Sequence, residues 1–241
     1  MKKAILLICF GNKNINIQLD KLEKNIKIEF YEYDIYKCFT SDFFIKKYGY
    51  SIKEVLNSIF NIGYEEIIFQ PLFTIDGKEY EKAIFYINKW KEKFKTIKVS
   101  RPLLYSEEDF KMLYNFIKKY YTTNVLYICH GTDNKSSYNY KKLFDMFKNE
   151  NIFFANLESK PYIENIIKDL KNKKITSICI KPFLLFNGKH IEQDIAGNNY
   201  NSVKNILLKN NIEVKLDLKP LLQYDEVIKI FINHLMESNI I

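Results

Sequence analysis

Short apolar runs alternate with amphipathic stretches along the whole chain. The runs are rich in Ile, Val and Phe and are apolar on both faces, which is typical of strands in a covered parallel sheet. They predict strands at residues 4–10, 28–35, 66–70, 97–100, 125–129, 152–157, 175–180 and 213–218. The stretches between them predict helices, the first of them short, and this alternation of strand and helix indicates an α/β fold.

Polar signals set the limits of several predicted helices. Residues 51–54, with the sequence SIKE, form a capping box, and Gly63 is expected to end the helix that follows. The sequence SEED opens another helix over about 106–120, and a last helix spans about 225–236. Pro161 suits the first turn of a further helix.

The two halves of the chain repeat each other. IIFQPLFTIDGKEYEK at 67–82 aligns without a gap with ICIKPFLLFNGKHIEQ at 178–193, at an offset of 111 residues. Near the start, LLICFG aligns in the same way with LYICHG, which lies 120 residues later. Two separate segments that recur in the same order indicate an internal duplication. We therefore expect an N-terminal α/β half over 1–121 and a C-terminal α/β half over 122–241.

The two copies differ at positions that carry chemistry. His130 stands where the first copy has Phe10, and His190 stands where it has Glu79. His130, Glu158 and His190 each follow a different predicted strand, and ligands of open α/β sheets bind at the carboxyl ends of strands. Two imidazoles and a carboxylate can bind a divalent first-row metal with positions left open, and they can also accept protons near neutral pH.

The third histidine and the cysteines lack such a context. His234 lies in the last predicted helix, away from any strand end, so we assign it a surface or packing role. The four cysteines are not in CxxC spacing, and most lie in apolar runs, where cysteine behaves as a small hydrophobic residue. They predict a reduced, cytoplasmic chain without disulfides.

Composition narrows the class of ligand. The chain is 47% hydrophobic and 27% charged, as in globular proteins, and its net charge is +8. Arg101 is the only arginine, which argues against a base-specific nucleic-acid reader, whereas small polycarboxylates or phosphates fit the positive charge. A flavodoxin-like phosphate-binding module lacks support, because no Gly-rich phosphate loop follows a predicted strand. No apolar run approaches the roughly 20 residues of a membrane span.

Several segments resemble the class II tetrapyrrole chelatases, and within them the anaerobic sirohydrochlorin cobaltochelatases of cobalamin synthesis. In the second half these are LYICHGT, NLESKPYIENII and KPFLLFNGKHIEQDIAG, and in the first half FTSDFFIKKYG, QPLFTIDGKEYEK and RPLLYSEEDF. The resemblance covers nearly the whole chain. It implies two flavodoxin-like parallel-sheet halves with a cleft between them that holds the macrocycle.

The resemblance also implies roles for individual residues. His130, Glu158 and His190 would bind the metal, and His130 would also take up pyrrole protons. Glu79 is a second expected catalytic residue, which would face the metal from the first half. Four further residues are expected to contact the substrate, namely Phe10, Gly11, Phe73 and Phe186. The first strand departs from the family pattern, because it runs into CFGNKN rather than a turn of the Ser-Phe-Gly-Thr-Ser kind.

The function implied is insertion of Co(II) into sirohydrochlorin or its precursor precorrin-2, with Co(II) as substrate metal and no other cofactor. We expect a cytoplasmic enzyme that binds neither nucleic acid nor membrane, and homo-oligomerisation is left open. One alternative is a chelatase for Fe(II) or Ni(II), since the ligand set does not separate these metals. Another is a tetrapyrrole or metal carrier without turnover, which the altered first turn motivates.

Overall fold

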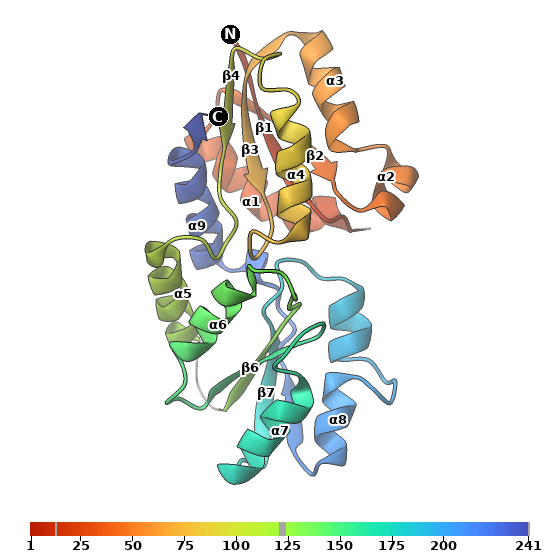
Figure 1. Ribbon diagram of the computed structural model, residues 1–241, viewed down its shortest axis with the longest axis vertical. Coiled ribbons are helices and arrows are strands. Elements are labelled where there is room, and N and C mark those ends of the chain that lie inside the picture. The colour runs from red at the N-terminus through yellow and green to blue at the C-terminus, as the bar shows by residue number, and fades with distance from the viewer. Residues whose placement is uncertain (13, 121–123, 241) are drawn as a thin grey trace. The chain divides into compact units, whose positions relative to one another are not determined.

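The computed structural model describes residues 1–12, 14–120 and 124–240 (Figure 1). The chain forms two compact units. Unit 1 comprises Met1–Asp109 with Tyr224–Ile241, and unit 2 comprises Phe110–Gln223. Among the described residues, none of the helices combines the length and the apolar character that crossing a membrane requires.

Unit 1 is built on a five-stranded sheet in the order β2-β1-β3-β4-β9. The first four strands are parallel, and the short β9 pairs antiparallel with β4. The strands are β1 (Lys2–Cys9), β2 (Tyr33–Phe39), β3 (Tyr64–Pro71), β4 (Thr96–Val99) and β9 (Asn239–Ile240). The interior strand β1, between β2 and β3, is buried from Ala4 onward, as a strand covered on both faces should be.

Helices cover both faces of this sheet. They are α1 (Ile15–Glu29), α2 (Asp42–Tyr48), α3 (Ile52–Ile62), α4 (Lys78–Asn88) and α9 (Asp225–Met236). Helices α3 and α4 contact each other, and they share one core with Ala4, Leu6 and Ile8 (Figure 1). Helices α1 and α9 contact each other, and α9 also contacts β3. The predicted capping box at Ser51 and the left-handed Gly63 at the end of α3 are confirmed.

Unit 2 is built on a four-stranded parallel sheet in the order β6-β5-β7-β8. Its strands are β5 (Val125–Cys129), β6 (Ile152–Asn156), β7 (Ser177–Pro182) and β8 (Glu213–Leu216). The helices are α5 (Glu107–Lys119), which begins at the boundary between the units, α6 (Ser137–Asp145), α7 (Ile163–Asn172), the π-helix η1 (His190–Ile195), α8 (Val203–Lys209) and the 3-10 turn η2 (Leu221–Gln223). Buried residues of α7, η1 and α8 form one core with Leu126 and Ile128.

The two sheets confirm the duplication. Each has the strand order 2-1-3-4, which is the flavodoxin-like order. In unit 1, Ile8 pairs with Pro71, and in unit 2, Ile128 pairs with Pro182. These pairs reproduce the offsets of 120 and 111 residues found in the sequence. The predicted fold class, with two parallel-sheet α/β halves, is therefore shown.

Two predicted boundaries differ from the structure. The chain does not divide into 1–121 and 122–241, because α9 contacts α1 and β3, and β9 pairs with β4. The second strand begins at Tyr33 rather than at residue 28, and the preceding residues extend α1 to a full fifteen-residue helix. The prediction of a short first helix was therefore wrong.

Two single-residue predictions also need correction. Pro161 precedes α7 by two residues, so it lies outside the first turn of that helix. His234 is not at the surface. It is buried in α9, where Nε2 lies 2.6 Å from Oδ1 of Asp109 and Nδ1 lies 3.2 Å from the carbonyl oxygen of Arg101. The alternative packing role of His234 is confirmed.

Candidate metal centre

His130 follows directly after β5, which lies between β6 and β7 in the sheet of unit 2. Gly131 comes next, with a φ of +81° that turns the chain away from the strand. Nδ1 of the imidazole lies 3.1 Å from the carbonyl oxygen of Gly131. The other nitrogen, Nε2, lies 3.5 Å from Oε1 of Glu158. The histidine therefore presents Nε2 at the carboxyl edge of the sheet.

The segment after β6 is held against the segment after β5 by backbone hydrogen bonds. The N–H of Leu157 donates to the carbonyl of Cys129 at 3.0 Å, and the N–H of Glu158 donates to the carbonyl of His130 at 2.9 Å. A Cβ on Gly131 would lie 2.6 Å from Oγ of Ser159, closer than real Cβ contacts come. Glycine therefore lets the two segments approach, and this approach places the Glu158 carboxylate beside His130.

His190 reaches the same edge from a third strand. A loop leads from the end of β7 to the π-helix η1, and His190 is the first residue of that helix. Ile191 and Ile195 of η1 are buried in the core of unit 2. The imidazole rings of His190 and His130 are nearly perpendicular, at 89°, with centroids 4.9 Å apart. Burial of the two isoleucines thus anchors η1 so that His190 lies next to His130.

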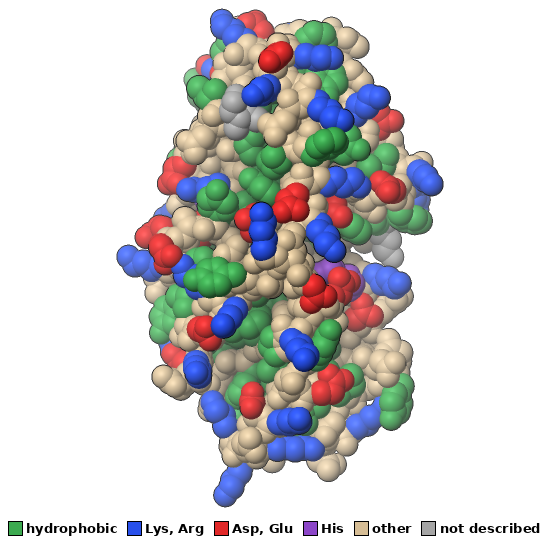
Figure 2. All heavy atoms as spheres, in the orientation of Figure 1, with side chains coloured by type: hydrophobic (Ala, Val, Ile, Leu, Met, Phe, Trp, Pro, Cys, Tyr) green, Lys and Arg blue, Asp and Glu red, His purple; other side chains and the backbone are tan. Residues whose placement is uncertain are grey.

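One ligand atom from each of His130, Glu158 and His190 lies within 4.8 Å of the other two. Ligand atoms bonded at about 2.1 Å to one tetrahedral ion lie about 3.4 Å apart, so small side-chain rotations suffice to close the site. The side chains are 43%, 55% and 40% exposed, respectively, so solvent and ligands can reach them. Histidine atoms are visible at the molecular surface in Figure 2. The predicted cluster is therefore brought together within unit 2 as a group of three potential metal ligands that solvent can reach.

The sequence matches the cobalt chelatase (CbiK) family over residues 3–240. The chain belongs to this family. It is 25% identical over 221 residues to a sirohydrochlorin cobaltochelatase of Salmonella typhimurium, with 85% of this chain and 84% of the relative covered. It is 21% identical over 252 residues to the sirohydrochlorin cobaltochelatase CbiKC of Nitratidesulfovibrio vulgaris, with 97% and 89% covered.

Solved structures agree on the fold. SirB from Bacillus subtilis with Fe3+ has a TM-score of 0.67 at 17% identity, with 98% of this chain and 95% of that chain covered. The sirohydrochlorin chelatase SirB from Bacillus subtilis subspecies spizizenii, in complex with cobalt, gives a TM-score of 0.67 at 16% identity and the same coverage. At such identities the likeness supports the α/β fold of this cobalt chelatase family member.

The other predicted site residues of this cobalt chelatase family member are spread over both units. Glu79 lies in the first turn of α4, and its Oε2 is buried without a hydrogen-bond partner among the described residues. Phe10 follows β1 and is exposed, and Phe73 follows β3 and packs partly against the core of unit 1. Gly11 has a φ of +117°. Phe186 follows β7 and is half-buried.

Phe183 directly follows β7, but it is not exposed to solvent or to a ligand. Its side chain is fully buried in the core of unit 2. Its ring makes edge contacts with Tyr127 and Phe154. It is therefore a core residue of this cobalt chelatase family member.

Asp194 is a candidate that the sequence interpretation missed. Its Oδ2 lies 2.7 Å from Nδ1 of His190. The signal was present in HIEQD, because residues four apart on a helix share a face. It could be recognised only if the segment after Lys189 was known to be helical. From the sequence alone, His190 is known only to follow a predicted strand.

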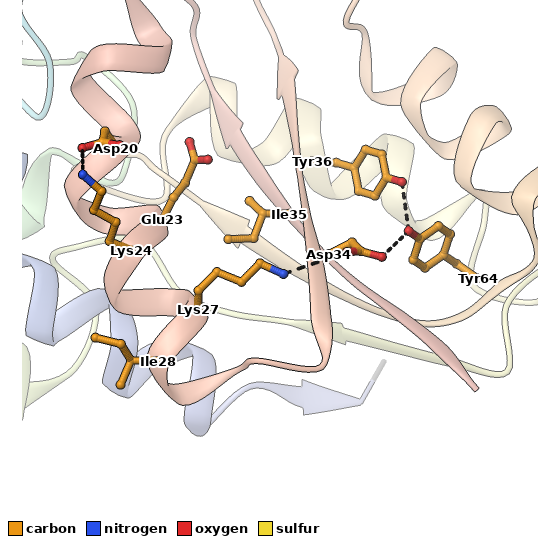
Figure 3. Close-up of a pocket in the computed structure, with 9 residues that line it drawn as sticks. All are labelled: Asp20, Glu23, Lys24, Lys27, Ile28, Asp34, Ile35, Tyr36 and Tyr64. Carbon is orange, nitrogen blue, oxygen red and sulfur yellow. Dashed lines mark hydrogen bonds and ion pairs between the residues drawn. The ribbon is translucent and has the colours of Figure 1, made fainter.

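A separate pocket of about 930 Å³ lies in unit 1 (Figure 3). It is lined by residues of α1 and β2 and by Tyr64 at the start of β3, which is the opposite end of the strand from Phe73. Several polar side chains that line it form ion pairs or hydrogen bonds with one another. Lys24 pairs with Asp20 at 2.6 Å, and the Tyr64 hydroxyl donates to Asp34 at 2.5 Å. Figure 3 shows these pairs along the walls, so the pocket has the character of a solvated surface depression.

Proposed function

We propose that this protein is a sirohydrochlorin cobaltochelatase, which inserts Co(II) into sirohydrochlorin or precorrin-2. The observation that carries the proposal is the cluster of His130, Glu158 and His190 at one sheet edge, in a chain of the cobalt chelatase family. The names of the relatives from Salmonella typhimurium and Nitratidesulfovibrio vulgaris support the choice of macrocycle and metal.

The ligand set suits a metal that must be delivered rather than stored. Two imidazoles and one carboxylate hold a divalent ion and leave coordination positions for the pyrrole nitrogens of the macrocycle. When Co(II) enters the ring, two pyrrole N–H protons leave, so charge is balanced. His130 is the proposed acceptor of one proton, at the Nε2 lone pair that becomes free once the metal has passed to the ring. Glu79 is the proposed partner in proton transfer from unit 1.

Charge and aromatic side chains support the proposed substrate. Sirohydrochlorin is a flat ring with many carboxylates, and a net charge of +8 attracts such an anion. The proposed macrocycle contacts are Phe10, Gly11, Phe73 and Phe186. Phe10 is exposed beside the strand end, and the ring of Phe44 fills the space that a Cβ on Gly11 would need. Replacing Gly11 would therefore displace an aromatic ring next to Phe10.

The remaining features of the proposal follow from the sequence. The enzyme works in the cytoplasm and needs no cofactor apart from its substrate metal, and its oligomeric state is left open. Fe(II) and Ni(II) are the competing metals, because imidazole and carboxylate ligands bind all three ions. The two SirB structures, one with Fe3+ and one with cobalt, are a reason to test iron beside cobalt.

The test combines metal insertion with changes at the three ligands. The purified protein is mixed with sirohydrochlorin and Co(II), Fe(II) or Ni(II), and insertion is followed by the absorbance of the macrocycle. We expect Co(II) insertion by the wild-type protein. His130→Ala and His190→Ala should each abolish it while thermal unfolding stays cooperative. Glu158→Gln should weaken Co(II) binding more than macrocycle binding.

Two results would contradict this assignment. Near-normal turnover by either histidine variant would show that the cluster is not the metal site. An equal loss of metal and macrocycle binding in Glu158→Gln would point to a structural role for Glu158. A matched control is Glu164→Gln, which changes an exposed carboxylate in the first turn of α7 and should insert Co(II) as the wild type does.

A further inference from the structure

We propose that Asp194 is a positioning residue that fixes the tautomer and the ring orientation of His190. The inference rests on the proposed function, since His190 is taken as a metal ligand. The carboxylate of Asp194 lies 2.7 Å from Nδ1 of His190, which leaves Nε2 as the ring nitrogen available to a metal. A histidine ligand whose other nitrogen donates to a carboxylate is oriented by it and becomes a more basic ligand.

The hydrogen-bonding chemistry determines which nitrogen carries the proton. An ionised carboxylate can only accept, so a neutral His190 must carry its proton on Nδ1. Its lone pair is then on Nε2, where a metal can bind. His130 reaches the same arrangement differently, because its Nδ1 lies 3.1 Å from the carbonyl oxygen of Gly131, which also only accepts. Both rings therefore offer Nε2, but at Nδ1 His190 has a carboxylate as its partner whereas His130 has a backbone carbonyl.

The local backbone is built to hold this pair together. The N–H of Ala196 donates to the carbonyl of Ile191 at 3.1 Å, an i to i+5 bond that defines a π-turn. A Cβ on Gly197 would lie 2.2 Å from the carbonyl oxygen of Gln193, so the turn can close only on a residue without a side chain. Single π-turns inside proteins are frequent at functional sites.

A comparison of the two units shows that the carboxylate of Asp194 occurs in the copy that has His190. The offset of 111 residues aligns His190 with Glu79 and Asp194 with Ala83. In unit 1 this segment is the regular helix α4, and Ala83 is fully buried in the core. In unit 2 the π-helix buries Ile191 and Ile195 instead, and Asp194 is partly exposed beside His190. The carboxylate is therefore not needed by the fold, and it is found in the copy that has the imidazole.

The experiment reads the tautomer and the metal affinity directly, without the macrocycle. The ring nitrogens of His190 are assigned by 15N NMR in the apoprotein, and the Kd for Co(II) is measured by titration. In the wild type we expect the proton on Nδ1. In Asp194→Ala the Nε2–H form should gain population, and the Kd for Co(II) should rise about 10- to 100-fold.

Two further variants separate positioning from charge and from folding. Asp194→Asn keeps an oxygen that can accept from Nδ1 but loses the charge, so its Kd should lie between those of the wild type and Asp194→Ala. Glu192→Gln removes an exposed carboxylate from the same π-helix and should leave both the tautomer and the Kd unchanged. Both side chains, Asp194 and Glu192, are at least partly exposed, so the three variants should unfold at temperatures close to that of the wild type.

The proposal and the proposed function fail in different ways. If Asp194→Ala keeps the Nδ1–H tautomer and the wild-type Kd, Asp194 does not position His190, even if the wild-type protein inserts Co(II). An equal loss of affinity in Glu192→Gln would also overturn the proposal, because it would reduce the effect to net charge. If the tautomer and the Kd change as expected but the wild type inserts no metal into sirohydrochlorin, the positioning role stands and the proposed function falls.

Discussion

At the scale of single residues, the same backbone carries different chemistry in the two units. The N–H of Ser41 donates to the carbonyl of Phe10 at 3.0 Å, just as the N–H of Glu158 donates to the carbonyl of His130 at 2.9 Å. Three positions of unit 1 thus match the proposed metal ligands, namely Phe10 with His130, Ser41 with Glu158, and Glu79 with His190. A phenyl ring and a hydroxyl are poor metal ligands, so the first copy retains only one side chain suited to metal or proton chemistry.

The role of Glu79 can be tested by removing its charge. Glu79→Gln should leave the Kd for Co(II) within about twofold of the wild type, because the three ligands in unit 2 are unchanged. It should lower kcat for insertion by roughly 10²- to 10⁴-fold, the usual contribution of a positioned acid or base. Stopped-flow absorbance gives kcat, and a Co(II) titration without macrocycle gives the Kd.

The matched control for Glu79 is Glu81→Gln, which changes an exposed carboxylate two residues along the same helix. It should leave kcat within about twofold of the wild type. A parallel loss of Co(II) affinity and kcat in Glu79→Gln would make Glu79 a metal ligand. An unchanged kcat would remove it from proton transfer.

The proposed ligands could be predicted from the sequence because each follows an apolar run that forms a parallel strand. The carboxyl ends of such strands meet at one edge, and the pairing of β5 with β6 then makes His130 and Glu158 neighbours. Asp194 could not be predicted in this way. Its place depends on a π-turn, and that turn requires both the buried face of η1 and the close approach of Gly197 to Gln193.

At the scale of elements, strands and helices with a clear period were predicted well. The strand β5 and the helix α9 have the predicted limits. The boundary between α1 and β2 was misplaced, because the apolar Ile26 and Ile28 resemble the start of a strand. In the structure Ile26 continues the buried stripe of α1, whereas Ile28 is exposed. Helices and strands are told apart in a sequence by the spacing of their apolar residues. An exposed apolar residue such as Ile28 disturbs that spacing, so the segment fits both.

The helix α9 is tied to the rest of unit 1 by a buried hydrogen-bonded pair. Nε2 of His234 lies 2.6 Å from Oδ1 of Asp109, and the other carboxylate oxygen, Oδ2, accepts from the backbone N–H of Ser106 at 2.7 Å. His234→Ala should therefore lower the free energy of unfolding by about 1–3 kcal/mol, because it leaves the buried carboxylate without this partner. Urea denaturation at neutral pH measures the change. Co(II) affinity should stay near the wild-type value, since His234 lies outside the ligand cluster.

The hydrogen-bonded pair of Asp109 and His234 should also make the stability of the protein sensitive to acid. Burial opposes ionisation of Asp109, but hydrogen bonding and attraction from His234 outweigh it and hold the pKa of this carboxyl below its ordinary value of 3.8. The folded protein then binds the proton less tightly than the unfolded chain does. The stabilisation from Asp109 is thus complete above pH 3.8 and is lost as the pH falls through the lower folded value.

The contribution of Asp109 to acid sensitivity can be separated from that of other carboxyl groups by comparing the wild type with His234→Ala. The difference in unfolding free energy between wild type and His234→Ala should shrink as the pH falls below 3.8. A difference that stays constant with pH would show that packing, and not the ion pair, carries the contribution of His234.

At the scale of the whole molecule, the duplication was visible in the sequence but the division into units was not. The repeat implies that the two sheets share one strand order, and in the structure equivalent strands do pair in equivalent registers. The return of α9 to unit 1 leaves no signal in the repeat. It depends on contacts of α9 with α1 and β3, which lie more than a hundred residues earlier in the chain.

Repeated turnover distinguishes a chelatase from a tetrapyrrole carrier. Both an enzyme and a carrier would bind the macrocycle, so binding does not separate them. A catalyst must stabilise the deprotonating, distorted macrocycle more than the flat product, and it must then release that product. A carrier that stored a metallated ring would need one axial ligand and would gain nothing from Glu158. The presence of two imidazoles and a carboxylate within 4.8 Å of one another therefore favours delivery of the metal over storage.

We expect one protein molecule to metallate many macrocycles. Substoichiometric protein is incubated with sirohydrochlorin and excess Co(II), and the metallated product is counted by absorbance against a protein-free control. Product should rise far beyond one equivalent per chain, and little of it should stay with the protein through gel filtration. His190→Ala serves as the matched control and should remain at the protein-free rate. If the reaction stops at one ring per chain and that ring elutes with the protein, the site retains its product, and the molecule is a carrier.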